Sequence, residues 1–279
     1  MSAMASPPPG PLPFWPVLGQ ALALPFLHAF SVIRLTWAWA FLLALVTGAL
    51  YRLLDDAQIT ALQEGAGFGP AGLNLLSLLL GLVIGSSVAV GWHRLLLLGE
   101  VPATAGYLRL DNTVWRYIAV AGLMLVLSMP FFAAAFIMAQ VAPEMTPKPG
   151  QPPPELSGGV AVLALGMLAA MCAAFLVTTR WSLALPARAI DDLALSLGDS
   201  WRLTQGSFWR LFAGTMACYV PTLVVASLVA SPGLAGGGPG GYIISVMLSS
   251  AAGLVTSVFP LAFLSLAYRH FMRIAPPVT

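Results

Sequence analysis

The stretch LNLLSLLLGLVIGSSVAVGWHR, residues 73–94, decides the fold class, because no charged residue occurs in it before its last position. A helix crosses about 30 Å of hydrocarbon with about 20 largely apolar residues, at about 1.5 Å rise per residue. A helix also pairs its own backbone groups inside lipid, which an isolated strand does not do. We therefore predict a transmembrane helix here that ends on the aromatic–basic cluster Trp92-His93-Arg94.

The rest of the chain has the same character. Of its 279 residues, 59% are hydrophobic and 8% are charged, whereas soluble domains carry about 25% charged residues. Six stretches are long and apolar enough to span a membrane: approximately residues 33–54, 73–93, 117–138, 159–180, 211–230 and 243–268. We predict an all-α, polytopic integral membrane protein whose six-helix membrane domain covers residues 26–274. The Pro-rich residues 1–25 are predicted to form a disordered cytoplasmic tail.

The six predicted spans group into three hairpins, each of which begins with an Arg- and Trp-rich stretch and finishes on an aromatic–basic cluster. The hairpins begin at residues 33–39, 108–116 and 201–210, and they finish at residues 92–94, 180–181 and 268–270. The pattern is compatible with an internal repeat. It is equally compatible with the general requirement of membrane hairpins for basic and aromatic inner ends.

The basic residues predict an orientation. Ten of the twelve Lys and Arg residues adjoin the span ends on the side of the amino terminus, and only Arg52 and Lys148 adjoin the other side. All eight Trp residues also fall at or beyond the inner ends of spans. The positive-inside rule therefore predicts that both termini are cytoplasmic. The preference for Arg over Lys, with abundant Ala, Gly and Pro, indicates a GC-rich bacterial genome, and so a bacterial inner membrane.

The inner connections are predicted to form amphipathic elbow helices. Between spans 4 and 5, apolar residues recur at helical spacing: Ile190, Leu193, Ala194, Leu197 and Trp201. Such a pattern predicts a helix in the membrane surface with its apolar side in the acyl boundary. Residues 95–110 form a shorter version of the same elbow.

The residues that usually carry chemistry are sparse. No Asp, Glu, Lys or Arg lies near the middle of a span, which disfavours an ion-coupled pump. His28, His93 and His270 have no metal-ligand spacing, and we predict interfacial histidines with no metal and no cofactor. The sequence contains no nucleic-acid motif and no assignable nucleophile–base pair. These observations favour a non-enzymatic protein.

The Arg and Trp clusters are the best candidate site. Arginine binds phosphate bidentately, and tryptophan settles at headgroup depth. The candidate residues for docking a lipid headgroup or a protein partner are Arg94, Arg109, Arg116, Arg180, Trp181, Arg188, Arg202, Trp209 and Arg210. The alternative is that they only anchor the helices and set their topology. We expect Asp191 and Asp192 to pair with arginines.

A second hypothesis is a transporter or channel for a small or lipidic solute. Ser77, Gly81, Gly85 and Ala89 make one side of span 2 small, which serves either close helix packing or a substrate path. Pro130, Pro221 and Pro260 are predicted to kink spans 3, 5 and 6.

The segment SLGDSWRLTQGSFWRLF, residues 196–212, preceded by Ala184-Leu185-Pro186-Ala187, resembles a known family. It is similar to bacterial six-span membrane proteins related to the membrane domain of glycerophosphodiester phosphodiesterases, in which a small-residue and Pro turn, Ser-Trp and Thr-x-Gly precede span 5. The resemblance implies the six-span fold. It covers no phosphodiesterase barrel, so it implies no phosphodiesterase activity.

Overall fold

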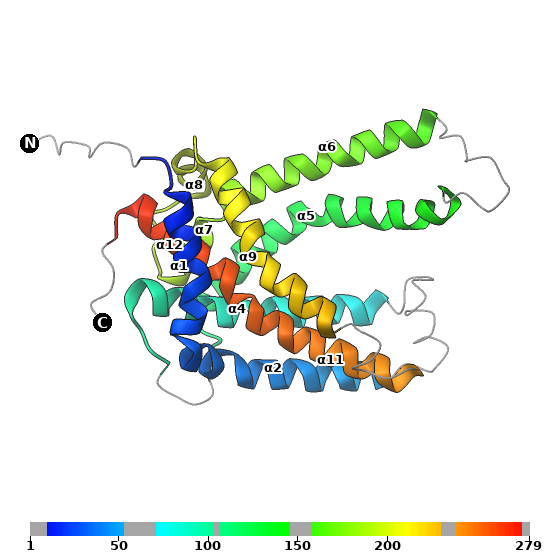
Figure 1. Ribbon diagram of the computed structural model, residues 1–279, viewed down its shortest axis with the longest axis horizontal. Helices are drawn as coiled ribbons and strands as arrows, with labels where there is room; N and C mark the ends of the chain where they lie inside the picture. The colour runs from blue at the N-terminus through cyan, green and yellow to red at the C-terminus, as the bar shows by residue number, and fades with distance from the viewer. Residues whose placement is uncertain (1–9, 53–70, 103–106, 146–157, 230–237, 275–279) are drawn as a thin grey trace, which may run out of the picture.

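The computed structural model describes residues 10–52, 71–102, 107–145, 158–229 and 238–274, and within them every regular element is an α-helix. Figure 1 shows their arrangement. The helices are α1 (Phe14–Leu27), α2 (Ala29–Arg52), α4 (Ala71–Leu98), α5 (Asn112–Met145), α6 (Gly158–Trp181), α7 (Ala184–Ala189), α8 (Leu197–Leu203), α9 (Phe208–Val229), α11 (Gly238–Thr256) and α12 (Val258–Met272).

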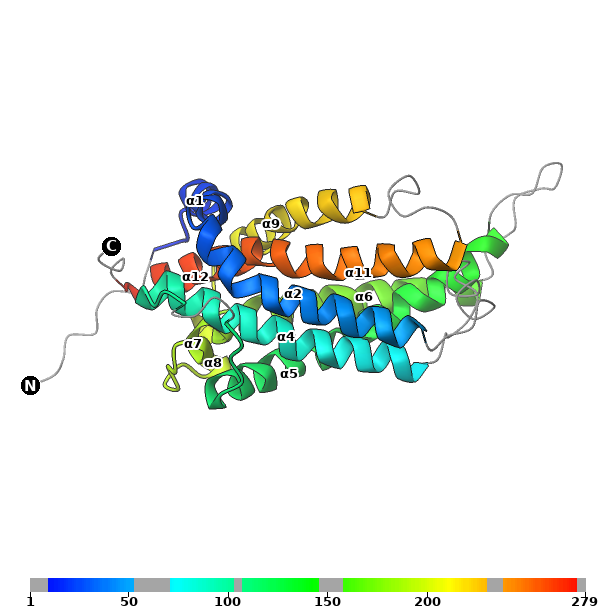
Figure 2. The ribbon, with the colours of Figure 1, turned by 90° about the horizontal axis from the view of Figure 1, so that it is seen from below.

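The long helices run side by side and alternate in direction along the chain (Figures 1 and 2). Among the described residues, five stretches are long and apolar enough to cross a membrane: Ala29–Val46, Leu78–Leu98, Asn112–Met129, Phe208–Val229 and Ile243–Met272. The prediction of an all-helical, multi-pass membrane protein is therefore confirmed. Helix α6 occupies the position of the fourth predicted span and packs along α5.

The predicted disordered tail is wrong for residues 14–25, which form helix α1. Pro13 and Pro16 lie at its amino-terminal end, where a helix needs no backbone N–H. Val17, Ala21 and Pro25 recur every four residues and are buried, because α1 packs on α12 and α9. The proline content indicated disorder, but the apolar spacing decides the structure. Residues 1–9 lie outside the described part of the chain.

Helix α1 runs crosswise over one end of the long helices (Figures 1 and 2). The side that faces away from the bundle is apolar as well: Trp15, Phe26 and Leu27 are each more than 70% exposed. A helix with apolar residues on both sides is stable where one side packs on protein and the other contacts lipid. The sequence predicted membrane-surface helices in the connections between spans. In the structure, α1 is a helix that lies crosswise in this way.

The last predicted span divides into α11 and α12 near Pro260. Pro260 has no N–H and leaves the carbonyl of Thr256 without its helical donor. The hydroxyl of Thr222, in α9, lies 3.5 Å from that carbonyl oxygen and donates to it. Pro221 lies inside α9, and α5 continues through Pro130 to Met145. The kink predicted at Pro260 therefore corresponds to a break between α11 and α12, whereas the helices that contain Pro130 and Pro221 are continuous.

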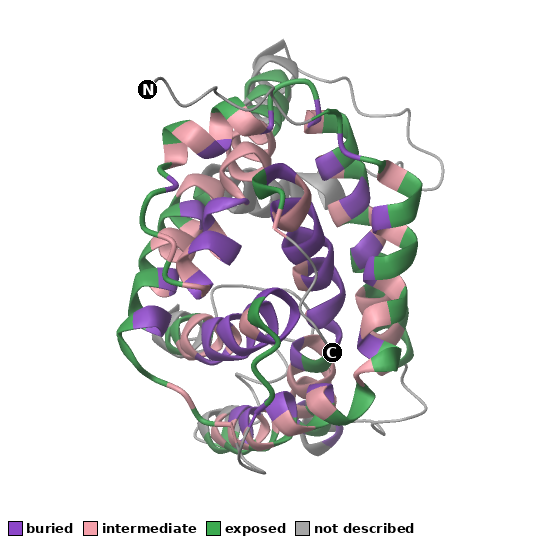
Figure 3. Cartoon of the chain, turned by 90° about the vertical axis from the view of Figure 1, so that its left-hand side faces the viewer, coloured by how far each residue is buried: buried purple, intermediate pink, exposed green. Residues whose placement is uncertain are grey.

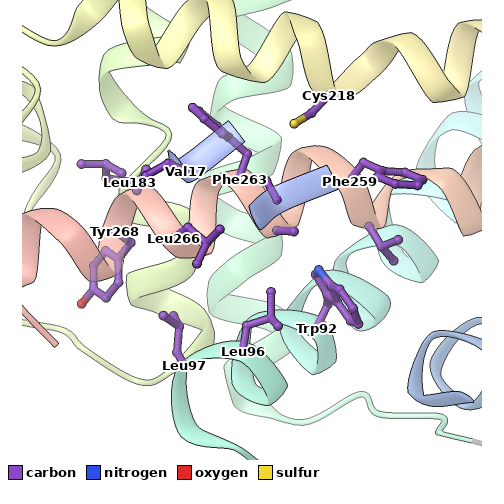
Figure 4. Packing of buried hydrophobic residues seen from close by; sticks show 14 of the residues in the cluster. Val17, Trp92, Leu96, Leu97, Leu183, Cys218, Phe259, Phe263, Leu266 and Tyr268 are labelled. Carbon is purple, nitrogen blue, oxygen red and sulfur yellow. The ribbon is translucent and has the colours of Figure 1, made fainter. Parts of the chain in front are cut away.

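The hydrophobic core lies at the end of the bundle that α1 crosses. Val17 of α1, Trp92 of α4 and Cys218 of α9 converge on α12, where Phe263 and Leu266 point toward them (Figure 4). Figure 3, which looks onto this end, shows buried residues in the centre and exposed residues around them. A packed, rigid end is therefore available to position a site.

Close helix approach occurs at glycines other than those predicted. A Cβ on Gly91 would overlap Leu35 and Tyr107, and a Cβ on Gly214 would overlap the ring of Phe263. At Gly81 and Gly85 a Cβ would have no atom of the described residues within 4 Å. The close-packing interpretation of the span-2 stripe is therefore wrong at these two positions. Gly81 instead borders a cavity between α4, α5 and α6.

Candidate functional site: the basic end of the bundle

The predicted elbow helix over residues 190–201 is wrong, because residues 190–196 are not helical and separate α7 from α8. Asp191 adopts a left-handed backbone conformation, with φ at 60°. The N–H of Asp192 then donates back to the carbonyl of Ala187 at 2.9 Å. The shorter elbow also fails, since residues 99–102 and 107–110 are not helical. Both connections fold onto the bundle because their charged side chains have partners there.

Asp191 joins three elements at this end. Its carboxylate accepts hydrogen bonds from Arg94 of α4 at 3.2 Å and from Arg116 of α5 at 3.3 Å. The hydroxyl of Thr113, also in α5, donates to it at 3.0 Å. An aspartate tolerates the left-handed region better than most residues. The expectation that Asp191 pairs with arginines is confirmed.

All three nitrogens of the Arg94 guanidinium donate hydrogen bonds within the protein. Its Nε and Nη2 donate to the two carboxylate oxygens of Glu100, both at 2.7 Å. Its Nη1 donates to Asp191 and to the carbonyl of Ala189. These hydrogen bonds from Arg94 lower the pKa of Glu100 below its ordinary value. Arg94 therefore ties α4 to the connection after α7, and most of its N–H donors are already used within the chain.

Arg109 and Arg188 also bind groups of the same chain. Arg109 forms an ion pair with Asp111, the residue that caps α5 through a hydrogen bond from the N–H of Val114. Burial opposes the charge on Arg109, but hydrogen bonds to Asp111 and Tyr107 raise its pKa. Arg188 donates to two backbone carbonyls, those of Asp192 and Leu195. Both arginines hold connections in place.

Arg210 fastens the amino-terminal segment to the bundle. Its Nη1 donates to the carbonyl of Leu12 at 2.9 Å. The N–H of Leu12 donates to the hydroxyl of Ser207 at 3.3 Å. At the other end of the chain, Nε2 of His270 lies 3.1 Å from the carbonyl oxygen of Gly10. The first and last described residues thus meet at the same end of the molecule.

Arg180 connects α6 to α8 through aromatic rings. Its guanidinium carbon lies 4.8 Å from the ring centroid of Trp201 and 5.8 Å from that of Phe208. The hydroxyl of Ser200 donates to the carbonyl of Arg180 at 2.7 Å. Helix α8 itself begins with a reciprocal capping box between Ser196 and Asp199. The aromatic–basic pattern here builds a helix–helix junction.

Only part of the predicted site faces outward. The side chain of Arg202 is 82% exposed, its ion pair with Asp199 being 3.8 Å long, and Trp209 is 74% exposed. Arg116 is about half exposed, and Trp181 is half-buried at the end of α6. The structure brings Arg94 and Arg116 together at Asp191. The other candidate arginines have separate partners, so the nine residues do not form one pocket.

A buried polar cluster corrects two predictions. His93 is fully buried and is not an interfacial histidine. Its Nδ1 lies 2.7 Å from the hydroxyl of Ser265, and its Nε2 lies 3.5 Å from the hydroxyl of Tyr117. A serine–histidine pair is therefore present, although none was predicted. Ser265 donates to the carbonyl of Leu261, so this cluster satisfies buried groups and joins α4, α5 and α12.

Two larger cavities among the described residues adjoin the bundle helices. One, of about 380 Å³, lies between α1 and α12 and includes Arg269, His270 and Arg273 in its lining. The other, of about 460 Å³, lies between α4, α5 and α6 and is mostly apolar. The sequence interpretation missed the first cavity because it placed α1 in a disordered tail. The basic last turn of α12 was the available signal.

Within the described ranges, no group of three His, Cys, Asp or Glu side chains is placed to hold a metal ion. No protein-family model, curated protein or solved structure matches the chain.

Proposed function

We propose that this chain is a non-enzymatic protein of the bacterial inner membrane that engages anionic phospholipid at its basic end. The observation that carries the proposal is a set of exposed tryptophans at that end, next to exposed arginines. The tryptophans are Trp15, Trp37, Trp115 and Trp209, and the arginines are Arg116 and Arg202. Tryptophan rings favour headgroup depth, and nearby cations attract anionic headgroups.

The membrane arrangement belongs to the same proposal. We propose six crossings, with α6 as the fourth span and α11 and α12 together as the sixth. The contact between His270 and the carbonyl of Gly10 supports an even number of crossings, since it joins the two described ends of the chain. The ten basic residues on this side support a cytoplasmic location for it. The relation to the membrane domain of glycerophosphodiester phosphodiesterases is likewise a proposal.

Lipid fits this end better than a protein partner does. Arg94, Arg109 and Arg188 are already paired with groups of the same chain. What remains outside is an apolar and aromatic surface with scattered positive charge, which suits a bilayer interface. A protein partner is the other outcome of the test below.

The test is native mass spectrometry of the full chain, released gently from membranes and offered phosphatidylglycerol and phosphatidylcholine in equal amounts. We expect preferential retention of phosphatidylglycerol, reduced in an Arg116→Gln/Arg202→Gln double variant. Arg52→Gln is the control, because it removes a charge from the opposite end of α2. Equal retention of both lipids would contradict the proposal. A stoichiometric co-purified protein without lipid preference would favour the partner instead.

The cavity between α4, α5 and α6 supports a second candidate function, transport of a lipidic solute. Its lining is mostly apolar, and the hydroxyls of Ser128 and Thr178 donate to carbonyls of their own helices. Gly81 lines it, and a Cβ there meets no atom within 4 Å. Gly81→Leu should therefore fold and fill the cavity. Lipid flux in proteoliposomes that Gly81→Leu abolishes would favour transport, and flux equal to that of empty vesicles would remove it.

A further inference from the structure

The groove between α1 and α12 has the size and lining of a ligand site. Its volume of about 380 Å³ falls within the range of roughly 300–1,000 Å³ that small-ligand sites occupy. Polar and shape-defining residues line it from both helices: Pro13, Pro16 and Gln20 from the α1 side, and Arg269, His270 and Arg273 from the α12 side. Val17 and Leu266 add an apolar part of the lining.

The described lining of the groove is basic. Among the residues that the structure describes, those that line the groove include arginine and histidine and no Asp or Glu. Arg269 is half-buried, and among the described residues its guanidinium has no hydrogen bond, ion pair or ring contact. Arg273 adds a second positive charge to the lining.

Hydrogen bonding to the end of α12 does not occupy the Arg269 side chain. Basic side chains at a helix carboxyl terminus do stabilise it, typically by interaction with the last carbonyls. The carbonyls of Arg269 and His270 are already paired with the N–H groups of Ile274 and Arg273. The left-handed φ of 53° at Arg273 closes the helix in this way. Arg269 lines the groove, and its guanidinium has no partner among the described residues, so it is available to a ligand there.

The position of the groove points to a membrane ligand. The last apolar stretch of the chain ends at Met272, so Arg269 and Arg273 lie at the level where the bilayer would give way to headgroups. Trp15, 76% exposed on α1, lies one residue from the groove-lining Pro16. Arginine recognises phosphate oxygens through paired N–H donors. A lipid phosphate at this depth would meet Arg269 while its acyl chains stay beside the bundle.

We propose that the α1–α12 groove binds one phosphate group of an anionic phospholipid, with Arg269 as the principal donor and Arg273 and Gln20 beside it. This inference rests on the proposed function and gives it a defined site. His270 has a separate role, because its contact with Gly10 holds the amino-terminal segment that closes one side of the groove.

The experiment is native mass spectrometry of the full chain in detergent, titrated with phosphatidylglycerol, with phosphatidylcholine, and with glycerol 3-phosphate as a soluble competitor. We expect one phosphatidylglycerol to bind more tightly than all others. Arg269→Gln should weaken that single binding event at least about tenfold, and Arg273→Gln, at an exposed position, should weaken it in the same direction. Arg52→Gln is the control, since it removes one exposed arginine from the last turn of α2 and leaves the groove and the basic end intact.

If Arg269→Gln and Arg273→Gln both bind the single lipid as tightly as the wild type does, the groove is not the phosphate site. The proposed function would still stand in that case if the wild-type chain prefers anionic lipid. Loss of that preference in the wild-type chain would overturn both. Displacement of the lipid by glycerol 3-phosphate would overturn a lipid source and assign the site to a soluble phosphate ester. If Arg269→Gln does not fold, as judged by thermal unfolding without lipid, Arg273→Gln decides the question.

Discussion

Gly214 lies where α9 packs on α12, and no side chain fits between its backbone and the ring of Phe263. We predict that Gly214→Ala lowers the free energy of unfolding by about 1–3 kcal/mol, the usual cost of overpacking a core. Thermal unfolding of the purified protein in detergent measures this. The ring of Phe263 is itself fully buried, so it has little room to move away.

Gly85→Ala is the matched control for that substitution. Gly85 also lies inside a long helix, α4, but an added Cβ there has no atom within 4 Å. Alanine is the better helix former by roughly 1 kcal/mol, so we expect a melting temperature equal to or slightly above that of the wild type. Similar losses in the two variants would show that α9 and α12 are not in close contact at Gly214.

Glu100 makes the stability of the basic end depend on pH. Hydrogen bonds from Arg94 hold the pKa of Glu100 below its ordinary value of 4.5 in the folded chain. The folded state therefore binds this proton less tightly than the unfolded state does. The contribution of the pair is present above about pH 4.5 and is lost as the pH falls through the lowered pKa.

We accordingly predict that the melting temperature of the wild type falls between pH 6 and pH 3 more steeply than that of Glu100→Gln. The variant lacks the titrating carboxylate but keeps a side chain of the same shape. Parallel pH profiles for the two proteins would mean that the Arg94–Glu100 pair, partly exposed to solvent, adds nothing measurable.

Helix α1 is held by the side that faces α12, and a pair of alanines tests this. Ala21 is fully buried, whereas Ala23, two residues along, is exposed. Ala21→Gln should release α1, because burying an amide without a partner costs roughly 1–3 kcal/mol in addition to the lost fit. Hydrogen exchange of the α1 backbone, followed by mass spectrometry, should accelerate in Ala21→Gln and not in Ala23→Gln. Equal exchange in both variants would show that α1 is not docked in solution.

The connection between α6 and α9 shows why an element can be misassigned. The apolar residues from Ile190 to Trp201 have helical spacing, but Asp191 and Asp192 have partners elsewhere. Asp191 bonds Arg94 and Arg116, and Asp192 accepts a 2.6 Å hydrogen bond from Tyr268. These contacts are available only when the chain turns at Asp191. Contacts with side chains that are distant in the sequence therefore outweigh the local helical spacing.

Basic residues and tryptophans gather at one end of the bundle and are scarce at the other. This asymmetry predicts how the chain is oriented in the membrane. In cells, a cysteine at position 52 should react with a membrane-impermeant maleimide, and a cysteine at position 202 should react only after permeabilisation. Arg52→Cys and Arg202→Cys are a matched pair, since both arginines are exposed and lie at opposite ends. The reverse labelling pattern would invert the proposed topology.

The helical class and the places where charge and tryptophan gather follow from the sequence. Apolar runs of about 20 residues are local features, and a bilayer leaves them few alternatives to a helix. The helix positions near Arg94, Arg180 and Arg210 were predictable for the same reason, because basic residues gather where apolar runs end.

Only the tertiary structure decided which of those residues are free to bind anything. Arg94 meets Asp191 across 97 residues, His93 meets Ser265 across 172, and Leu12 meets Ser207 across 195. The groove between α1 and α12 likewise joins the two ends of the described chain. Contacts at such separations depend on how the packed helices bring side chains together, and short-range spacing carries no information about them.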